Sequence, residues 1–190
     1  MKINKNITIE TDRIKLVPLA MHFLQDYYNL YSDYDTCKYL YYFSRKTDTN
    51  FPLEKAKTSL EKSVFQWETE KPEYLDFAIL DKKSNNFIGI VDFSFTEENN
   101  KKGIGWTIDK KYRKCGYATE AANAIIQYLF SETNTNKIIA YCDTRNIASQ
   151  KIMQKLGMKI AIQNQPRVYF LTGEKASEMM MYIEKNNYLH

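Results

Sequence analysis

The chain has 190 residues, of which 44% are hydrophobic and 26% charged, a composition typical of one globular domain. This apolar content excludes a wholly disordered chain, and six glycines and four prolines exclude a collagen-like or linker-rich architecture. The 27 basic and 23 acidic residues leave a net charge of +4, too small and scattered for a typical nucleic-acid-binding face. We therefore expect one domain over residues 1–190, with a core over about 7–185, and no nucleic-acid partner.

Cysteine and histidine usage argues against a metal site and against disulfides. The cysteines, Cys37, Cys115 and Cys142, are odd in number, no C-x-x-C pattern occurs, and the chain has only two histidines. The first ten residues lack the apolar region of a signal peptide, and no apolar run approaches the ~20 residues of a membrane span. We expect a cytoplasmic protein with reduced thiols, no metal and no membrane contact, as a monomer or homodimer.

Apolar patterning predicts one strand and two helices early in the chain, followed by three strands. The expected elements are a strand over 7–18, helices over 20–31 and 52–69, and strands over 76–80, 87–96 and 103–108. Polar turns at 81–86 and 97–102 separate the three later strands, so we expect an antiparallel meander. The pattern of the tyrosine-rich segment 34–43 is ambiguous.

The second half of the chain mixes helices and strands. The expected elements are helices over 118–130 and 146–156, and strands over 137–142, 158–162, 168–171 and 177–183. Gly157 falls where a helix commonly ends on a left-handed residue. This order predicts an α+β (mixed α/β) fold with a central mixed sheet flanked by helices.

The most informative stretch is residues 104–120, where a strand runs through a basic loop into an amphipathic helix. A helix N-terminus exposes unpaired N–H groups and a partial positive charge, and a loop of aligned amides extends this donor set. Gly116 lets an anion approach the backbone closely, and Arg113 adds positive charge. Neither the Walker pattern nor G-x-G-x-x-G is present. The stretch predicts a phosphate or pyrophosphate site; the alternative is a basic turn that merely precedes a helix.

A second strand-to-helix junction lies about thirty residues further on. Asn146 follows the strand over 137–142 and precedes a helix that carries Ser149. Asn146 either binds a ligand or only caps its helix, and Ser149 faces either a site or solvent. If the two preceding strands are adjacent and parallel, both junctions lie at one edge of the sheet, where α/β units commonly bind ligands.

Three motifs in this order resemble the GNAT superfamily of N-acetyltransferases, in particular its ribosomal-protein N-acetyltransferase-like branch. The pattern R-x-x-G-x-A at Arg113–Ala118 is similar to the family's acyl-CoA pyrophosphate loop. The pattern N-x-x-S-x-x-x-x-x-x-x-G-M at Asn146–Met158 is similar to its second cofactor-contacting helix, and I-E-T-D-R-I-K-L-V-P-L at Ile9–Leu19 resembles the opening of that branch. The resemblance covers residues 7–183 and implies a GNAT-like acyl-CoA N-acyltransferase fold with a mostly antiparallel mixed sheet.

The resemblance also implies that acetyl-CoA is the cosubstrate and assigns residues to it. Backbone amides of the loop would hold the pyrophosphate, and these belong to Arg113, Lys114, Cys115, Gly116, Tyr117, Ala118 and Thr119. The strand before the loop would pair with the pantetheine arm as an added strand, through Gly105, Trp106, Thr107 and Ile108. Asn146 is expected to bond the pantetheine, and Ser149 aligns with a serine thought to stabilise or protonate the leaving thiolate.

The chain departs from the family pattern at three places. The loop reads R-K-C-G where R-G-K-G is common, so a positive φ at Lys114 would cost about 1 kcal/mol. Met153 stands where many members have a tyrosine general acid, and Val17 replaces an arginine common in the first strand. The missing acid and the altered loop also fit an alternative, a non-catalytic acyl-CoA-binding regulator.

The implied reaction is direct transfer of an acetyl group to a primary amine, either a peptide or protein terminal amine or a small amine. Alkylamines are mostly protonated at pH 7, so a carboxylate acting through water is needed to remove the proton. Asp92 is the first candidate, with Glu97 and Glu98 as others, although Asp92 alternatively is an ordinary surface carboxylate. Backbone amides of the cofactor strand are expected to polarise the thioester carbonyl.

Two side-chain features near this site keep alternatives open. A tyrosine cluster lies in the segment that forms the acceptor side in GNAT relatives. These tyrosines either line an amine pocket by cation–π contact or only pack in the core or at its rim. The cluster consists of Tyr31, Tyr34, Tyr39, Tyr41 and Tyr42. Cys115 lies near a helix N-terminus, which lowers a thiol pKa, but no histidine accompanies it in the sequence. We therefore expect phosphate contact at that position rather than a covalent acyl-enzyme.

Overall fold

The computed structural model describes residues 5–41, 51–96 and 101–188, and its centre is a mixed sheet of eight strands. The strands are β1 (Ile9–Glu10), β2 (Ile14–Pro18), β3 (Tyr74–Asp81), β4 (Phe87–Phe95), β5 (Lys101–Ile108), β6 (Lys137–Asp143), β7 (Lys159–Val168) and β8 (Lys175–Glu184). Their order in the sheet is β1-β2-β3-β4-β5-β6-β8-β7. All neighbours run antiparallel except the parallel pair β5 and β6, so the sheet is mostly antiparallel, as the sequence predicts.

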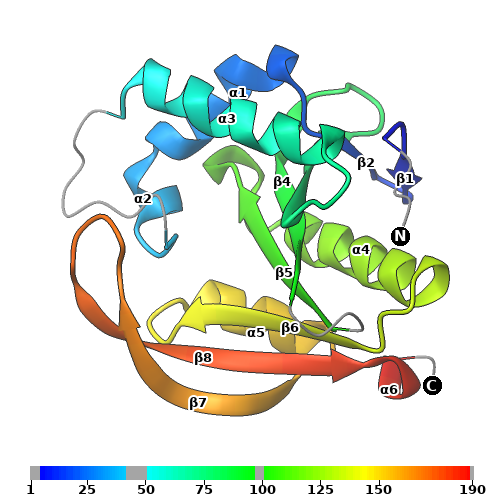
Figure 1. The fold of residues 1–190 in the computed structure, drawn as a ribbon, viewed down its shortest axis with the longest axis vertical. Helices are drawn as coiled ribbons and strands as arrows, with labels where there is room; N and C mark the ends of the chain where they lie inside the picture. Colours follow the sequence, from blue (N-terminus) through cyan, green and yellow to red (C-terminus); the bar gives the residue numbers. More distant parts are fainter. Residues whose placement is uncertain (1–4, 42–50, 97–100, 189–190) are drawn as a thin grey trace.

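Helices cover both faces of the sheet (Figure 1). They are η1 (Met21–Phe23), α1 (Leu24–Ser32), α2 (Tyr34–Cys37), α3 (Leu53–Glu68), η2 (Lys110–Tyr112), α4 (Tyr117–Glu132), α5 (Ile147–Lys155) and α6 (Lys185–Tyr188). Side chains of β3 alternate between the two faces, as a pleated strand requires. Phe77 and Ile79 join a core with α4 and α5, whereas Ala78 and Leu80 join a second core with α1 and α3.

The sheet opens between β5 and β6. Residues 101–103 pair with residues 137–139, and along these two described strands no further residue pair joins them. Figure 1 shows the strands side by side where they begin and splayed apart where they end. The backbone edge of residues 104–108 that faces β6 therefore has no neighbouring strand, and the loops after both strands lie at the same open end.

Most of the predicted elements are confirmed. The meander is β3, β4 and β5, the parallel neighbours are β5 and β6, and the helix expected over 52–69 is α3, flanked by Pro52 and Thr69. Gly157 follows α5 with a φ of 75°, the left-handed conformation expected at a helix end. Within the ambiguous segment, residues 34–37 form the short helix α2.

Three predicted segments are wrong in their boundaries. The strand expected over 7–18 is instead two antiparallel strands, β1 and β2, joined by residues 11–13. The strand expected over 168–171 is instead the end of β7 and the turn into β8, and the apolar residues that suggested it, Phe170 and Leu171, are exposed. Tyr169 of this run is fully buried, but Val168, Phe170 and Leu171 are exposed, so the apolar run does not mark a separate strand. The turn expected over 97–102 is shorter, since Lys101 and Lys102 belong to β5; residues 97–100 lie outside the described residues.

Candidate functional site

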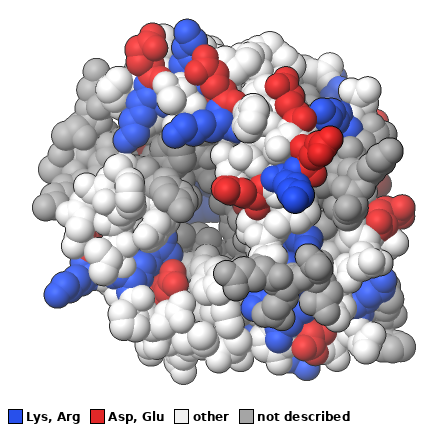
Figure 2. Space-filling view, in the orientation of Figure 1, with Lys and Arg blue, Asp and Glu red and all other residues white. Residues whose placement is uncertain are grey.

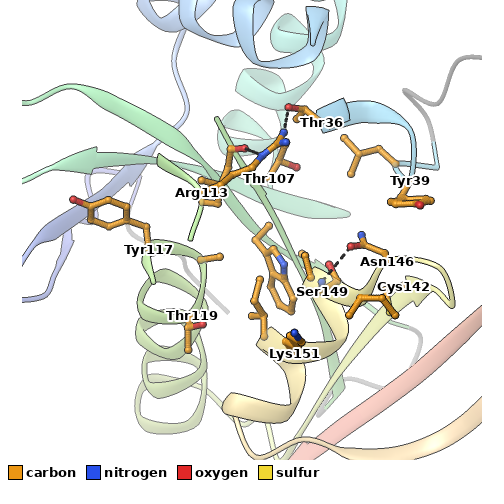
Figure 3. A pocket seen from close by; sticks show the side chains of 18 of the residues that line it. Thr36, Tyr39, Thr107, Arg113, Tyr117, Thr119, Cys142, Asn146, Ser149 and Lys151 are labelled. Carbon is orange, nitrogen blue, oxygen red and sulfur yellow. Dashed lines mark hydrogen bonds between the residues drawn. The ribbon is translucent and has the colours of Figure 1, made fainter. Parts of the chain in front are cut away.

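A cavity of about 1110 Å³ lies where β5 and β6 separate (Figure 3). Its lining combines β5, the loop before α4, the first part of α5 and the segment around α2. The residues predicted from the sequence that line it are Asp92, Gly105, Trp106, Thr107, Ile108, Arg113, Lys114, Gly116, Tyr117, Ala118, Thr119, Asn146 and Ser149. Cys115 is the predicted residue that the lining omits, and its side chain is exposed.

The loop before α4 carries a row of backbone donors. Lys114 and Gly116 have φ values of 62° and 86°, so the chain turns twice through the left-handed region before the helix begins. The Arg113 N–H already donates to the Lys110 carbonyl at 3.5 Å. The first helical N–H groups have no intrahelical acceptor, so the donors that an anion could use come from residues 114–119.

The N-terminal strand region holds this loop in place. Thr11 donates through Oγ1 to Glu120 Oε1 at 2.5 Å, and Arg13 donates through Nε to Glu120 Oε2 at 2.7 Å. Arg13 also donates through Nη1 to the Cys115 carbonyl at 3.0 Å, and its guanidinium lies 4.7 Å from the centre of the Tyr117 ring. The T-D-R part of the opening motif therefore fixes the loop, a role the sequence did not indicate.

Arg113 links the loop to the segment around α2, and its positive charge is paired rather than free. Its Nε donates to the Ile108 carbonyl at 3.3 Å, and its Nη2 contacts an Asp33 carboxylate oxygen at 3.3 Å and the Thr36 hydroxyl. Asp33 in turn accepts the Thr36 N–H at the start of α2. The ion pair neutralises much of the charge that the sequence assigned to anion binding.

At the second junction, the helix-cap interpretation of Asn146 describes what its side chain does. Asn146 Oδ1 accepts the Ser149 N–H at 3.2 Å, which satisfies a donor in the first turn of α5 (Figure 3). Both residues also line the cavity. Met153, at the position where many GNAT sequences have tyrosine, is fully buried in the core and does not line the cavity.

Asp92 is a half-buried carboxylate at the cavity, not an ordinary surface group. It lies directly opposite Asp76 in the register of β3 and β4, so the two side chains share the face covered by α1 and α3. Burial, and then the negative charge of Asp76, raise the pKa of Asp92 to about 7. Burial also raises the pKa of Asp76 to about 6, which its hydrogen bond with Ser63 partly offsets. The other candidates, Glu97 and Glu98, lie outside the described residues.

Gly105 gives the Asp92 carboxylate its space. A Cβ atom at position 105 would lie 2.5 Å from Asp92 Oδ2, closer than any non-bonded contact allows. The absence of a side chain on β5 is therefore what lets a carboxylate on β4 sit against the cavity-lining strand.

The tyrosine cluster divides between core and cavity. Tyr31 is buried beside Tyr27, with ring centroids 4.5 Å apart, whereas Tyr39 and Tyr41 line the cavity. Tyr34 is not part of the lining, and Tyr42 lies outside the described residues.

Sequence reasoning missed the basic side chains that line the cavity near Tyr39 and Tyr41. They are Lys38, Arg145 and Arg167. Arg145 donates from Nε and Nη2 to the fully buried Asp143, at 2.9 and 2.7 Å. Lys38 is about a hundred residues away in sequence from the two arginines, and no local motif predicts that these segments come together.

The cysteines do not form a reactive centre. Cys142 lines the cavity, but burial raises its pKa to about 11, so its thiol stays protonated at neutral pH. Cys115 Sγ lies 3.4 Å from the Arg113 carbonyl oxygen. Among the described residues, no group of three or more His, Cys, Asp or Glu side chains is arranged to hold a metal ion. None of the helices described is both long and apolar enough to cross a bilayer.

Sequence comparison finds related proteins. The uncharacterized N-acetyltransferase YnaD of Bacillus subtilis (strain 168) is 39% identical over 84 residues, or 44% of this chain and 49% of that protein. The match thus spans about half the length of that curated relative.

Solved structures establish the fold. An acetyltransferase (GNAT family) from Bacillus anthracis gives a TM-score of 0.77 at 23% identity, over 95% of this chain and 99% of the other. The spermidine N-acetyltransferase from Vibrio cholerae, solved in complex with CoA and spermine, gives 0.76 at 17% identity, over 95% and 100%. The family model described as "Acetyltransferase (GNAT) domain" matches residues 13–159. Because this match covers well over half of the residues, the chain belongs to the GNAT family of acetyltransferases.

Proposed function

We propose that the protein is an acetyl-CoA-dependent N-acetyltransferase that transfers the acetyl group directly to a primary amine. The observation that carries this proposal is the cavity at the split between β5 and β6, with backbone donors at one end and the Asp92 carboxylate on its wall. We call the part lined by residues 112–119 the cofactor end. The part lined by Lys38, Tyr39, Tyr41, Arg145 and Arg167 is the acceptor end.

The cofactor end suits a pyrophosphate. The donors of residues 114–119 are backbone N–H groups at a helix N-terminus, and Gly116 has no side chain to cover them. The edge of β5 beyond Gly103 has no strand partner on the cavity side, so residues 105–108 offer main-chain groups to an extended pantetheine arm. When bound, acetyl-CoA supplies an acetyl thioester whose carbonyl carbon accepts the amine nitrogen.

Asp92 is proposed as the general base. Its pKa, raised by burial and by the charge of Asp76, suits a group that must both take up and release a proton. Asp92 takes the proton, directly or through a water, that the amine loses as its nitrogen bonds to the carbonyl carbon. Backbone N–H groups of β5 stabilise the charge that develops on the carbonyl oxygen.

Ser149 is proposed to assist departure of the sulfur. Its hydroxyl is on the first turn of α5 at the cavity, and it can donate a proton to the thiolate as the carbon–sulfur bond breaks. The fully buried Met153 offers no proton for this purpose. The variant Ser149→Ala should therefore turn over more slowly with an unchanged affinity for acetyl-CoA.

The decisive experiment compares the wild type with Asp92→Asn. We expect acetyl-CoA to bind both, while turnover of a panel of primary amines, followed as CoA release, falls by about 100-fold or more in the variant. The control is Ser94→Ala, a change on the same strand at a residue outside the cavity lining, which should leave both quantities unchanged. Tight acetyl-CoA binding without turnover of any amine would contradict the proposal and favour a non-catalytic acyl-CoA-binding regulator.

A further inference from the structure

The acceptor end of the cavity is rich in basic side chains that already occupy its aromatic rings. The Arg145 guanidinium lies 5.6 Å and Lys38 Nζ 5.5 Å from the centre of the Tyr39 ring, and the Arg167 guanidinium lies 5.5 Å from that of Tyr41. A cationic acceptor would have to displace these groups to reach the rings. The tyrosines therefore do not form a cage for a polyamine.

Arg167 presents a pair of donors suited to an oxyanion. Its side chain is only 8% exposed, yet it lines the cavity. Nη1 donates to Glu178 at 3.0 Å, and Nη2 makes a long contact of 3.5 Å with the Tyr39 carbonyl oxygen. Nε is buried and makes no hydrogen bond within the described residues. Nε and Nη2 form one edge of the guanidinium, whose parallel N–H groups match the two oxygens of a carboxylate or phosphate.

The guanidinium groups at this end are paired with carboxylates that do not line the cavity. Asp143 is fully buried behind Arg145, and Glu178 is already bonded by Gln165 and Arg167. Neither carboxylate lines the cavity. Glu174, which also pairs with Arg145, stands outside the lining as well.

One acidic residue does line the acceptor end. Asp35 forms an ion pair of 2.9 Å with Lys38, so it balances a cation that is itself part of the lining. The guanidinium groups of Arg145 and Arg167 line the cavity, but each is paired with a carboxylate outside the lining. Recognition of a negative group there therefore depends on the donors of Arg167 and not on a net positive charge.

We propose that the acceptor is a primary amine whose molecule also carries a carboxylate or phosphate, bound by the Nε–Nη2 edge of Arg167. This inference rests on the proposed acetyltransferase function and assigns its substrate class. The acceptor's oxygens accept hydrogen bonds from this buried edge, and these bonds orient the amine toward Asp92 and the thioester. Arg145, held by Asp143, lies beside the Tyr39 ring.

The test compares matched amines with and without the negative group. The pairs are glycine with glycinamide and O-phosphoethanolamine with ethanolamine, and spermidine represents polycations. For each probe we measure kcat/KM and, with CoA present, binding by calorimetry, in the wild type and in Arg167→Met. Comparing the two proteins probe by probe cancels differences in the intrinsic reactivity of the amines.

For the favoured anionic probe we expect Arg167→Met to lower kcat/KM and affinity by about 10- to 100-fold. The neutral partner should change by less than about twofold, and acetyl-CoA affinity should be unchanged. Arg167→Lys should recover only part of the loss, since it keeps the charge but not the two-donor edge. Lys159→Met, which removes an exposed cation from the same strand, is the control.

The outcomes distinguish a carboxylate-bearing acceptor from a phosphate-bearing one. They also distinguish failure of this inference from failure of the proposed acetyltransferase function. Selective loss with glycine assigns a carboxylate, and selective loss with O-phosphoethanolamine assigns a phosphate. Equal use of anionic and neutral probes, or preference for spermidine, overturns the inference while leaving the acetyltransferase function intact. Binding of an anionic probe that depends on Arg167, without turnover of any amine, supports the oxyanion site and overturns the proposed function. If Arg167→Met does not fold, Arg167→Lys tests the inference through the same ratio of kcat/KM between anionic and neutral probes.

Discussion

The two ends of the cavity are built from different parts of the chain and from different chemical groups. At the cofactor end the donors are main-chain N–H groups of one continuous segment, residues 114–119. At the acceptor end the donors are side chains from positions 38, 145 and 167, which only the completed fold brings together. Figure 2 shows basic and acidic residues interspersed over the face of the molecule that it draws.

This difference bears on what each end can recognise. A row of backbone N–H groups depends on the conformation of the loop and tolerates many side chains, so it suits a cosubstrate common to a family. A set of guanidinium groups held by buried carboxylates depends on the identity of each residue, so it suits an acceptor particular to one protein. Mutations should therefore act through the backbone at the cofactor end and through side-chain chemistry at the acceptor end.

The largest effect is expected where the backbone of the cofactor end is disturbed. Gly116 has a φ of 86°, and a valine there would be forced out of this conformation and would cover the donors. We expect Gly116→Val to weaken acetyl-CoA binding by about 100-fold or more, as measured by calorimetry. The matched control is Gly173→Val, which has a φ of 65° in the turn between β7 and β8. It imposes similar strain away from the cavity, and equal affinity losses in both variants would argue against the loop assignment.

The same difference explains how much the sequence could predict. The loop, its glycine and the helix that follows are contiguous, so elementary helix physics and a short motif were enough to propose an anion site within this one segment. The parallel pairing of β5 and β6 was only a condition for bringing the two junctions together, and the structure meets this condition. The strand expected over 168–171 failed because Phe170 and Leu171 of this apolar run are exposed in the turn after β7.

Other parts of the site depend on long-range contacts that no local pattern encodes. Arg113 looked like a phosphate ligand, but Asp33, eighty positions earlier, pairs with it. Thr11 and Arg13 looked like strand residues, yet they anchor Glu120 on α4. No sequence pattern indicated a role for Arg167, because its partners Tyr39 and Glu178 come close to it only in the folded chain. Each case is a polar side chain whose partner is distant in sequence.

Between the two ends, a second prediction concerns the fit of Asp92 against β5. In Gly105→Ala the new Cβ would lie 2.5 Å from Asp92 Oδ2, so the carboxylate must move. We expect kcat to fall by about 10- to 100-fold, since small misplacements of a base are costly, while acetyl-CoA affinity stays within about twofold. Gly103→Ala is the control, because its Cβ would press on Ser94 Oγ instead. A similar loss of kcat in both variants would indicate general distortion of β5.

A third prediction concerns the Asp76–Asp92 pair. The Asp76 charge contributes to the raised pKa of Asp92, so Asp76→Asn should lower that pKa. The acidic limb of the kcat/KM profile should then move to lower pH, and activity at pH 6, relative to the plateau, should rise a few-fold. A profile that does not move would mean that Asp92 is not the group that titrates, or that Asp76 does not act on it.

The same variant has a second readout in stability. The folded pKa of Asp76, about 6, lies above the ordinary value of 3.8, so its contribution to stability is present below pH 3.8 and is lost as the pH rises through 6. Asp76→Asn removes one such group. Urea unfolding at pH 4.5 and pH 7.5 should therefore show a smaller fall in unfolding free energy between these values in the variant than in the wild type.

The smallest effect tests whether the cofactor end depends on backbone conformation alone. Lys114 has a φ of 62°, which costs a non-glycine residue about 1 kcal/mol. Lys114→Gly should therefore be more stable than Lys114→Ala by about 1 kcal/mol, a difference of about 2–4 °C in Tm. Both variants lose the same charged side chain, so if the backbone N–H groups carry the binding, both should keep acetyl-CoA affinity within about threefold of the wild type. A loss of tenfold or more in both would show that the cofactor end, too, relies on side-chain charge, and the contrast between the two ends would be one of degree.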